Sequence, residues 1–154
     1  MVSALSKTET DDTSSSEFVY DSNSAVLIDT NGFMIPVQFG VDIFSELQRL
    51  GFSKFLTIPA VVSELERLSK IASGNDRTAA RVALQLSQKC SLLETLAHGN
   101  GVRKYADDII IETALRHSVS VLTNDAGLRQ KLMKRRITVV SMRQMKRLDI
   151  MNPK

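Results

Sequence analysis

Short apolar runs alternate with segments of helical periodicity along most of the chain, from about residue 25 to residue 148. The apolar runs at residues 25–29, 55–58, 120–123 and 137–140 have the length that is typical of buried strands. Strands that alternate with helices predict βαβ units, in which the sheet is mainly parallel. The pattern therefore predicts an α/β fold.

Between the strands, apolar side chains recur at intervals of three and four residues, which is the periodicity of an amphipathic helix. Gly51 predicts the end of the first of these helices, Pro59 the first turn of the second, and Asp76 the N-cap of the third. Helices are expected over residues 42–50, from residue 59 onward, and over 76–89, 109–117, 126–135 and 143–148, with residues 92–96 as a short strand or the last turns of a helix.

Residues 1–23 differ from the rest of the chain. They are rich in Ser, Thr, Asp and Glu, lack a sustained periodicity, and carry five acidic residues against Lys7 alone. Such a composition predicts a disordered tail, because it cannot bury enough apolar surface to fold. We therefore expect an acidic, Ser/Thr-rich tail over residues 1–23 and a single folded domain over residues 24–150.

The overall composition fits one globular domain, since 154 residues with 43% hydrophobic content are too few for two well-packed cores. No apolar run approaches the roughly 20 residues of a membrane-spanning helix, so a cytoplasmic protein is expected. Cys90 is the only cysteine, which excludes an internal disulfide and a cysteine-built metal site. The two histidines, His98 and His117, have no metal-ligand spacing and are interpreted as surface residues.

Four acidic residues each lie close to the point where an apolar run ends or a helix begins: Asp29, Glu64, Asp107 and Asp125. The carboxyl ends of parallel strands meet at one edge of a sheet, so Asp29 and Asp125 are expected to be neighbours there. Asp29 closes a fully apolar run, where an unpaired charge is costly. Gathered carboxylates are commonly balanced by a divalent metal ion.

Each of the other acids also has a plainer interpretation. Asp107, Asp108 and Asp125 would serve as helix caps or turn residues. Glu64, which lies beside another acid and an arginine, would be a solvated helix residue. Asp29 is the hardest of the set to explain without a partner.

The net charge is +3 and the sequence pI about 9.2, and most of the basic residues lie in the C-terminal third. This basic segment is either a set of solvated helix faces or a nucleic-acid contact surface. The part that follows Asp125 begins beside the acidic edge, where cations would hold flanking phosphates. The candidate RNA-binding residues are Arg129, Lys131, Lys134, Arg135 and Arg136.

Four segments taken together resemble the PIN-domain ribonuclease family. They are Val-Leu-Ile-Asp-Thr-Asn at residues 26–31, Ile-Pro-Ala-Val-Val-Ser-Glu-Leu at 58–65, Ala-Asp-Asp-Ile-Ile at 106–110, and Leu-Thr-Asn-Asp at 122–125 with Leu128 and Arg129. The resemblance covers about residues 25–148. It is strongest to the archaeal and eukaryotic PIN proteins linked to ribosomal RNA processing, and VapC toxins are more distantly similar.

The resemblance implies a three-layer α/β/α sandwich around a parallel sheet. It also implies that the four acids bind Mg²⁺ or Mn²⁺ and carry out catalysis, with Asn31 and Thr123 as supporting residues and Asp108 as a substitute for or assistant to Asp107. Gly127 departs from the family pattern, because relatives often have another acid two positions after the last aspartate. This departure leaves the second metal position open.

Three functions remain in competition at this point. The first is a metal-dependent endoribonuclease that acts on structured RNA, with ribosomal RNA precursors as the expected substrate. The second is a VapC-like toxin, whose partner would be a protein that blocks the acidic groove. The third is a catalytically weak module of the same fold that binds RNA or protein. A homodimer through residues 41–50 is an open alternative to burial of that helix in the core.

Overall fold

The computed structural model describes residues 24–95 and 106–152. The predicted tail and His98 lie outside these residues. Within them the chain forms one six-stranded sheet and six helices. The strands are β2 (Ala25–Ile28), β3 (Lys54–Thr57), β4 (Ser91–Leu92), β5 (Ser120–Leu122), β6 (Val139–Arg143) and β7 (Arg147–Met151). The helices are α1 (Thr30–Phe39), α2 (Ile43–Arg49), α3 (Pro59–Ile71), α4 (Asn75–Ser87), α5 (Ala106–His117) and α6 (Ala126–Lys134).

The sheet has the strand order β4-β3-β2-β5-β6-β7, in which every neighbouring pair is parallel except the antiparallel pair β6–β7. From β2 the chain adds β3 and β4 on one side, then returns to add β5 and β6 on the other. The strand order therefore reverses between β2 and β5. In open α/β sheets the carboxyl ends of the strands at such a reversal form the usual ligand site.

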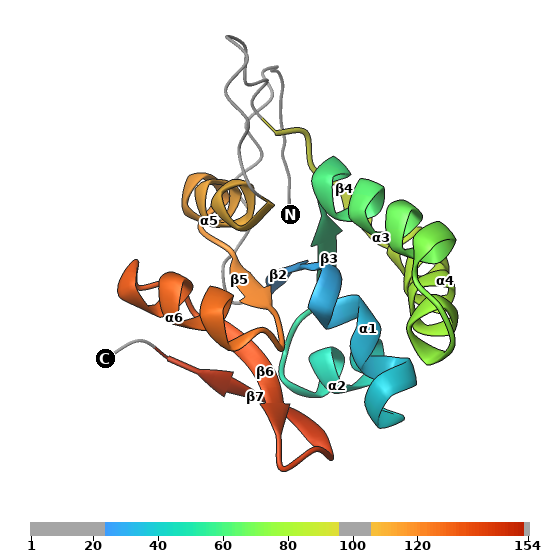
Figure 1. Cartoon of the computed structure of the whole chain (residues 1–154). Helices are drawn as coiled ribbons and strands as arrows, with labels where there is room; N and C mark the ends of the chain where they lie inside the picture. The colour runs from blue at the N-terminus through green and yellow to red at the C-terminus, as the bar shows by residue number, and fades with distance from the viewer. Residues whose placement is uncertain (1–23, 96–105, 153–154) are drawn as a thin grey trace, which may run out of the picture.

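The helices lie in two layers, one on each face of the sheet (Figure 1). Helices α1 to α4 cover one face and helices α5 and α6 the other. Connections between parallel strands are right-handed. When the chain begins to add strands on the other side of β2, right-handed connections place the helices on the opposite face of the sheet. The α/β/α sandwich expected from the sequence is thus confirmed.

The central strands form the core. All four residues of β2 and all three of β5 are buried, and so are Leu56 and Val139 on the strands beside them. The apolar residues of α2 point into this core, with Ile43 and Leu47 fully buried. Burial in the core therefore accounts for the apolar face that was the candidate dimer surface.

The prediction of a final helix over residues 143–148 is wrong. This segment turns back as a hairpin, and β7 pairs with β6 in antiparallel register. A helix of six residues would bury little surface and is marginal by itself, whereas the hairpin buries Leu148 completely and gives β6 a hydrogen-bonding neighbour. The sheet is consequently mixed, with one antiparallel strand at its edge.

Helix α1 was not predicted, and Pro36 lies within it. Proline has no N–H to donate to the carbonyl of Gly32, four residues earlier, and normally disfavours a helix interior. The helix forms because Asp29 caps its start, and because Phe33 and Ile35 are fully buried. The N-cap of α4 also differs from expectation, since it is Gly74, and Asp76 lies in the first turn instead.

Two further expectations concern single residues. Cys90 is partly buried against the core, and desolvation raises the pKa of its thiol to about 12, as expected for a structural residue. His117 is half-buried at the end of α5 rather than fully on the surface. In the described part of the chain, no helix is long and apolar enough to span a membrane.

Candidate active site

Asp29 and Asp125 follow the two strands between which the strand order reverses. The register pairs Ile28 of β2 with Leu122 of β5, and the Asp29 backbone N–H donates to the Leu122 carbonyl oxygen at 3.2 Å. Asp29 is therefore level with Thr123, and Asp125 lies two residues further along. The topology places both aspartates at the same edge, as the sequence predicted.

The Asp29 carboxylate is buried, with only 5% of the residue exposed, and each of its oxygens accepts one hydrogen bond. Oδ1 accepts from the Gly32 backbone N–H at 2.8 Å, and Oδ2 accepts from the Thr123 hydroxyl at 2.9 Å. The first of these bonds makes Asp29 the N-cap of α1. The second ties it to β5, so both side-chain torsions are fixed from two elements.

Gly32 allows the start of α1 to approach the end of β5 closely. A Cβ atom at this position would lie 2.8 Å from the Leu122 carbonyl oxygen and about 3 Å from the Ile28 side chain. Any larger residue would push α1 away from the sheet and lengthen the bond from the Gly32 N–H to Asp29. Sequence reasoning missed Gly32, although an aspartate followed three residues later by glycine, directly after an apolar run, is a usable signal.

Burial raises the pKa of Asp29 from 3.8 to about 7. Desolvation is the largest cause, since the buried site disfavours the charged form. The hydrogen bonds from Gly32 and Thr123 lower the pKa, while the negative charges of Asp125 and Asp107 raise it. These three aspartates therefore lie close enough to interact electrostatically, and Asp29 is the one that most needs a cation.

The Thr123 hydroxyl links Asp29 to Asp125. It donates to Asp29 and accepts from the Asp125 backbone N–H at 3.1 Å. Asp125 in turn caps α6, where its Oδ1 accepts from the Gly127 N–H at 2.9 Å. The capping role proposed for Asp125 is thus real, and the same residue still lies at the acidic edge.

Asp107 lies in the first turn of α5, near the other two aspartates. Its Oδ2 is 3.4 Å from the Lys131 ammonium, which reaches it from the second turn of α6. Asp108 is next to it in the same turn and more exposed. Neither residue is the cap of α5, because the helix already begins at Ala106.

Glu64, the fourth acid of the predicted site, is paired with an arginine of its own helix. It lies on α3 with 37% of its side chain exposed, and its carboxylate forms an ion pair with Arg67 at 2.9 Å. The acids that raise the pKa of Asp29 are Asp125 and Asp107, and Glu64 is not among them. Asn31 lies in the first turn of α1 with its side chain exposed, two residues after Asp29.

Comparison with known proteins identifies the family. A family profile described as "PIN like domain" matches residues 26–145. The protein belongs to the PIN-domain family. Ribonuclease VapC9 of Archaeoglobus fulgidus is 33% identical over 124 residues, which are 80% of this chain and 87% of that protein.

The chain is also similar to an rRNA-processing protein and to a PIN domain endonuclease of known structure. The rRNA-processing protein FCF1 of Saccharomyces cerevisiae is 32% identical over 112 residues, which cover 71% of this chain and 54% of FCF1. The solved structure of the PIN domain endonuclease Utp24 superimposes with a TM-score of 0.67 and 26% identity, covering 86% of this chain and 94% of that chain.

The PIN-domain site has the donors that Mg²⁺ or Mn²⁺ prefers, since the gathered side chains are all carboxylates. Each oxygen of Asp29 accepts a single hydrogen bond and so retains a lone pair. Among residues 24–95 and 106–152, no three His, Cys, Asp or Glu side chains are gathered tightly enough to hold a metal ion as they stand.

The predicted RNA-binding residues of the PIN domain divide along α6. Arg129 and Lys131 lie in its first two turns, where Arg129 donates to the Ser141 hydroxyl at 3.2 Å and Lys131 contacts Asp107. Lys134 to Arg136 lie at the far end of the helix. Arg136 lines a groove with Ser118 and Ile137 at the amino ends of the strands, opposite the acidic edge. The structure thus brings only the first two cations to the site.

Proposed function

We propose that this PIN-domain protein is a metal-dependent endoribonuclease that hydrolyses RNA phosphodiester bonds. The observation that carries the proposal is the buried Asp29 carboxylate, held between α1 and β5 beside Asp125 and Asp107, with no ion pair to a Lys or Arg of the described residues. The relatives named ribonuclease, rRNA-processing protein and PIN domain endonuclease support the same activity.

In this proposal Asp29 and Asp125 bind Mg²⁺ or Mn²⁺ directly. Asp107 is shared between the metal and the attacking water, and Asp108 is its neighbouring substitute. Glu64 acts as a ligand or positions the water, which requires it to leave Arg67. Thr123 and Asn31 are supporting residues, and Arg129 and Lys131 hold phosphates beside the site, with Lys134 to Arg136 as more distant contacts.

A hard divalent cation in this site would activate a water molecule and stabilise the negative charge that grows on the phosphate. The protein itself contributes the burial and the orientation of the Asp29 carboxylate. Burial keeps Asp29 in a site of low polarity, where its attraction for a cation is strong. The Thr123 hydroxyl and Gly32 N–H fix the direction of its lone pairs.

Ribosomal RNA precursors are the proposed substrate class, supported by the similarity to FCF1. A toxin function is the second candidate, and the VapC9 relative and the 30% identical Ribonuclease VapC4 of Methanocaldococcus jannaschii favour it. The toxin would require a protein partner that blocks the acidic edge. Growth arrest on expression, relieved by a neighbouring gene product, would distinguish it from a processing enzyme.

A third candidate keeps the fold as a binding module, and Gly127 is the observation that favours it. The family pattern expected from the sequence has an acid at this position, whereas here the Gly127 backbone N–H donates to Asp125. Such a module would bind RNA and leave it intact. A homodimer and a cytoplasmic location are further proposals. The oligomeric state of the purified protein tests the first, and its location in the source cell tests the second.

The proposed activity is tested by incubating a structured RNA pool with the full chain in Mn²⁺, in Mg²⁺ and in EDTA. Asp29→Asn removes the buried charge and keeps the helix cap. Asp42→Asn is the matched control, because Asp42 is also an N-cap that accepts from the backbone N–H three residues later, at the exposed start of helix α2. Metal-dependent cleavage that only Asp29→Asn abolishes is expected. Intact RNA in both metals would contradict the proposal.

A further inference from the structure

The β6–β7 hairpin extends past the acidic edge of the sheet. Val140 pairs with Leu122, so Ser141 is level with Thr123, and β6 continues for two more residues to Arg143. At about 3.3 Å per residue, Arg143 stands roughly 7 Å beyond that level. The hairpin tip projects at the bottom of the view in Figure 1, away from the helices. It is two strands from Asp29, or about 10 Å across the sheet.

The hairpin tip is a tight turn made of unusual residues. Gln144 and Met145 both have positive φ values, of 57° and 59°, and the Lys146 N–H donates to the Arg143 carbonyl oxygen at 3.2 Å. Glycine or asparagine normally occupies such positions, and other residues cost about 1 kcal/mol or more each. The turn presents side chains where glycines would present none, and Met145 at the apex is 70% exposed.

The charge of the hairpin is positive. Arg143, Lys146 and Arg147 face one acid, Asp149, which pairs with Arg143 at 3.2 Å. Lys146 and Arg147 are exposed and have no ion pair within the described part of the chain. Both side chains are open to solvent, although the charge of Arg147 is near enough to Glu46 to lower the pKa of that carboxyl.

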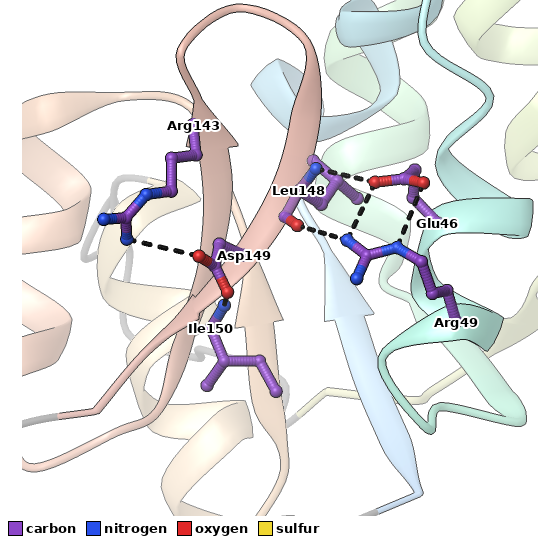
Figure 2. A network of polar contacts seen from close by, with 6 residues as sticks. All are labelled: Glu46, Arg49, Arg143, Leu148, Asp149 and Ile150. Atoms are coloured by element: carbon purple, nitrogen blue, oxygen red, sulfur yellow. Dashed lines mark hydrogen bonds and ion pairs between the residues drawn. The ribbon is translucent and has the colours of Figure 1, made fainter.

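The β7 strand of the hairpin is held by α2 close to the tip, as Figure 2 shows. Glu46 accepts from the Leu148 N–H at 3.0 Å, and Arg49 donates to the Leu148 carbonyl oxygen at 2.8 Å. These α2 side chains take the place of a further strand at the sheet edge. The bonds from Arg49 and Leu148 also lower the pKa of Glu46. The cations therefore lie on a well-held segment, so that binding a ligand costs little conformational entropy.

We propose that the tip of this hairpin grips the RNA backbone beside the cleavage site, with Lys146 and Arg147 on phosphates that flank the scissile bond. The inference rests on the proposed ribonuclease function, because it assigns the hairpin to the same substrate. It replaces the far end of α6 as the main RNA contact, since Arg136 lies at the opposite edge of the sheet and the hairpin tip lies at the edge that carries the acids.

The test is RNA affinity of the full chain, measured by fluorescence anisotropy with a labelled structured RNA in EDTA over a series of KCl concentrations. The variant Lys146→Gln with Arg147→Gln keeps the Arg143–Asp149 pair. Its control, Lys54→Gln with Lys70→Gln, removes the same charge from exposed residues at the start of β3 and in the last turn of α3, away from the acidic edge.

We expect the hairpin variant to bind roughly tenfold more weakly at low salt, and the slope of log K against log salt to flatten by about 1.5, as for two lost phosphate contacts. The control should bind like the wild type. An equal loss in both variants, or none in the hairpin variant, would overturn the inference. Unchanged RNA binding would instead indicate that the basic hairpin surface binds an acidic protein partner.

Cleavage in Mn²⁺ separates this inference from the proposed function. The hairpin variant should reach the wild-type maximal rate at a roughly tenfold higher RNA concentration, because the chemistry at Asp29 is intact. If the wild type binds RNA through the hairpin and never cleaves it, the ribonuclease proposal fails and only the RNA contact of the hairpin stands. If the wild type cleaves and the hairpin variant matches it at every RNA concentration, the hairpin inference fails alone.

Discussion

The Thr123 hydroxyl donates a 2.9 Å hydrogen bond to the buried carboxylate of Asp29, 94 residues away in the chain. The same oxygen accepts from the Asp125 N–H. One threonine therefore sets the relative position of two proposed metal ligands from different strands. Threonine suits this position because it is small, β-branched and able to donate and accept at once.

Thr123→Val should lower RNA cleavage by roughly tenfold or more, because it removes the bonds that orient Asp29 and Asp125. It should also lower the free energy of unfolding by about 2 kcal/mol, since buried polar groups lose partners. Thr57→Val is the control. Thr57 is equally buried, but its hydroxyl donates to a backbone carbonyl, that of Ile28, at 3.1 Å rather than to a carboxylate. If both variants lose stability and activity in parallel, Thr123 is only structural.

Gly32→Ala should destabilise the protein by roughly 1–3 kcal/mol in urea unfolding, because its Cβ would lie 2.8 Å from the Leu122 carbonyl oxygen. Activity should fall further than stability explains, since the shift of α1 disturbs the bond from the Gly32 N–H to Asp29. Gly127→Ala in α6 is the comparison, where the nearest atom is 3.4 Å away. A Gly32→Ala protein as stable and active as Gly127→Ala would show that the close approach is unimportant.

The raised pKa of Asp29 predicts how stability depends on pH in the absence of metal. In the unfolded chain this carboxyl ionises near pH 3.8, and in the folded protein near pH 7. Its contribution to stability is therefore full below pH 4, declines as the pH rises to about 7, and stays low above it. Thermal unfolding of wild type and Asp29→Asn should reveal this decline as the difference between their two pH profiles.

Divalent metal should reverse that loss, because a bound cation favours the ionised form of Asp29. The increase in melting temperature on adding Mn²⁺ should be larger at pH 8 than at pH 5.5. In Asp29→Asn the increase should be small at both values. Equal Mn²⁺ stabilisation of the wild type at both pH values would show that the metal does not compete with a proton on Asp29.

The sequence predicted the βαβ order and the meeting of Asp29 with Asp125 because both depend on short-range signals. Apolar runs mark the strands, and parallel strands bring their carboxyl ends together whatever lies between. The contribution of Gly32 depends on the carbonyl of Leu122, 90 positions later, which no local pattern reveals. The pairing of Glu64 with Arg67 depends on side-chain geometry on one exposed helix face.

The β6–β7 hairpin is an element that the local sequence pattern did not predict. Residues 143–148 carry cations at helical spacing, and their local pattern favours a helix. The decisive contacts are tertiary, since Leu148 is buried and its backbone groups pair with Glu46 and Arg49 of α2. In helix α1, tertiary burial instead favours a helix that the local sequence disfavours, because burial of Phe33 and Ile35 outweighs the cost of Pro36.

The most direct test is the single-turnover rate of RNA cleavage as a function of Mn²⁺ concentration, for the wild type, Asp29→Asn and Asp42→Asn. The account predicts a saturable rise with Mn²⁺ in the wild type and in Asp42→Asn, and a rate at least roughly a hundredfold lower in Asp29→Asn, as expected when a metal ligand is lost. Cleavage by Asp29→Asn at the wild-type rate, or cleavage that persists in EDTA, would contradict it.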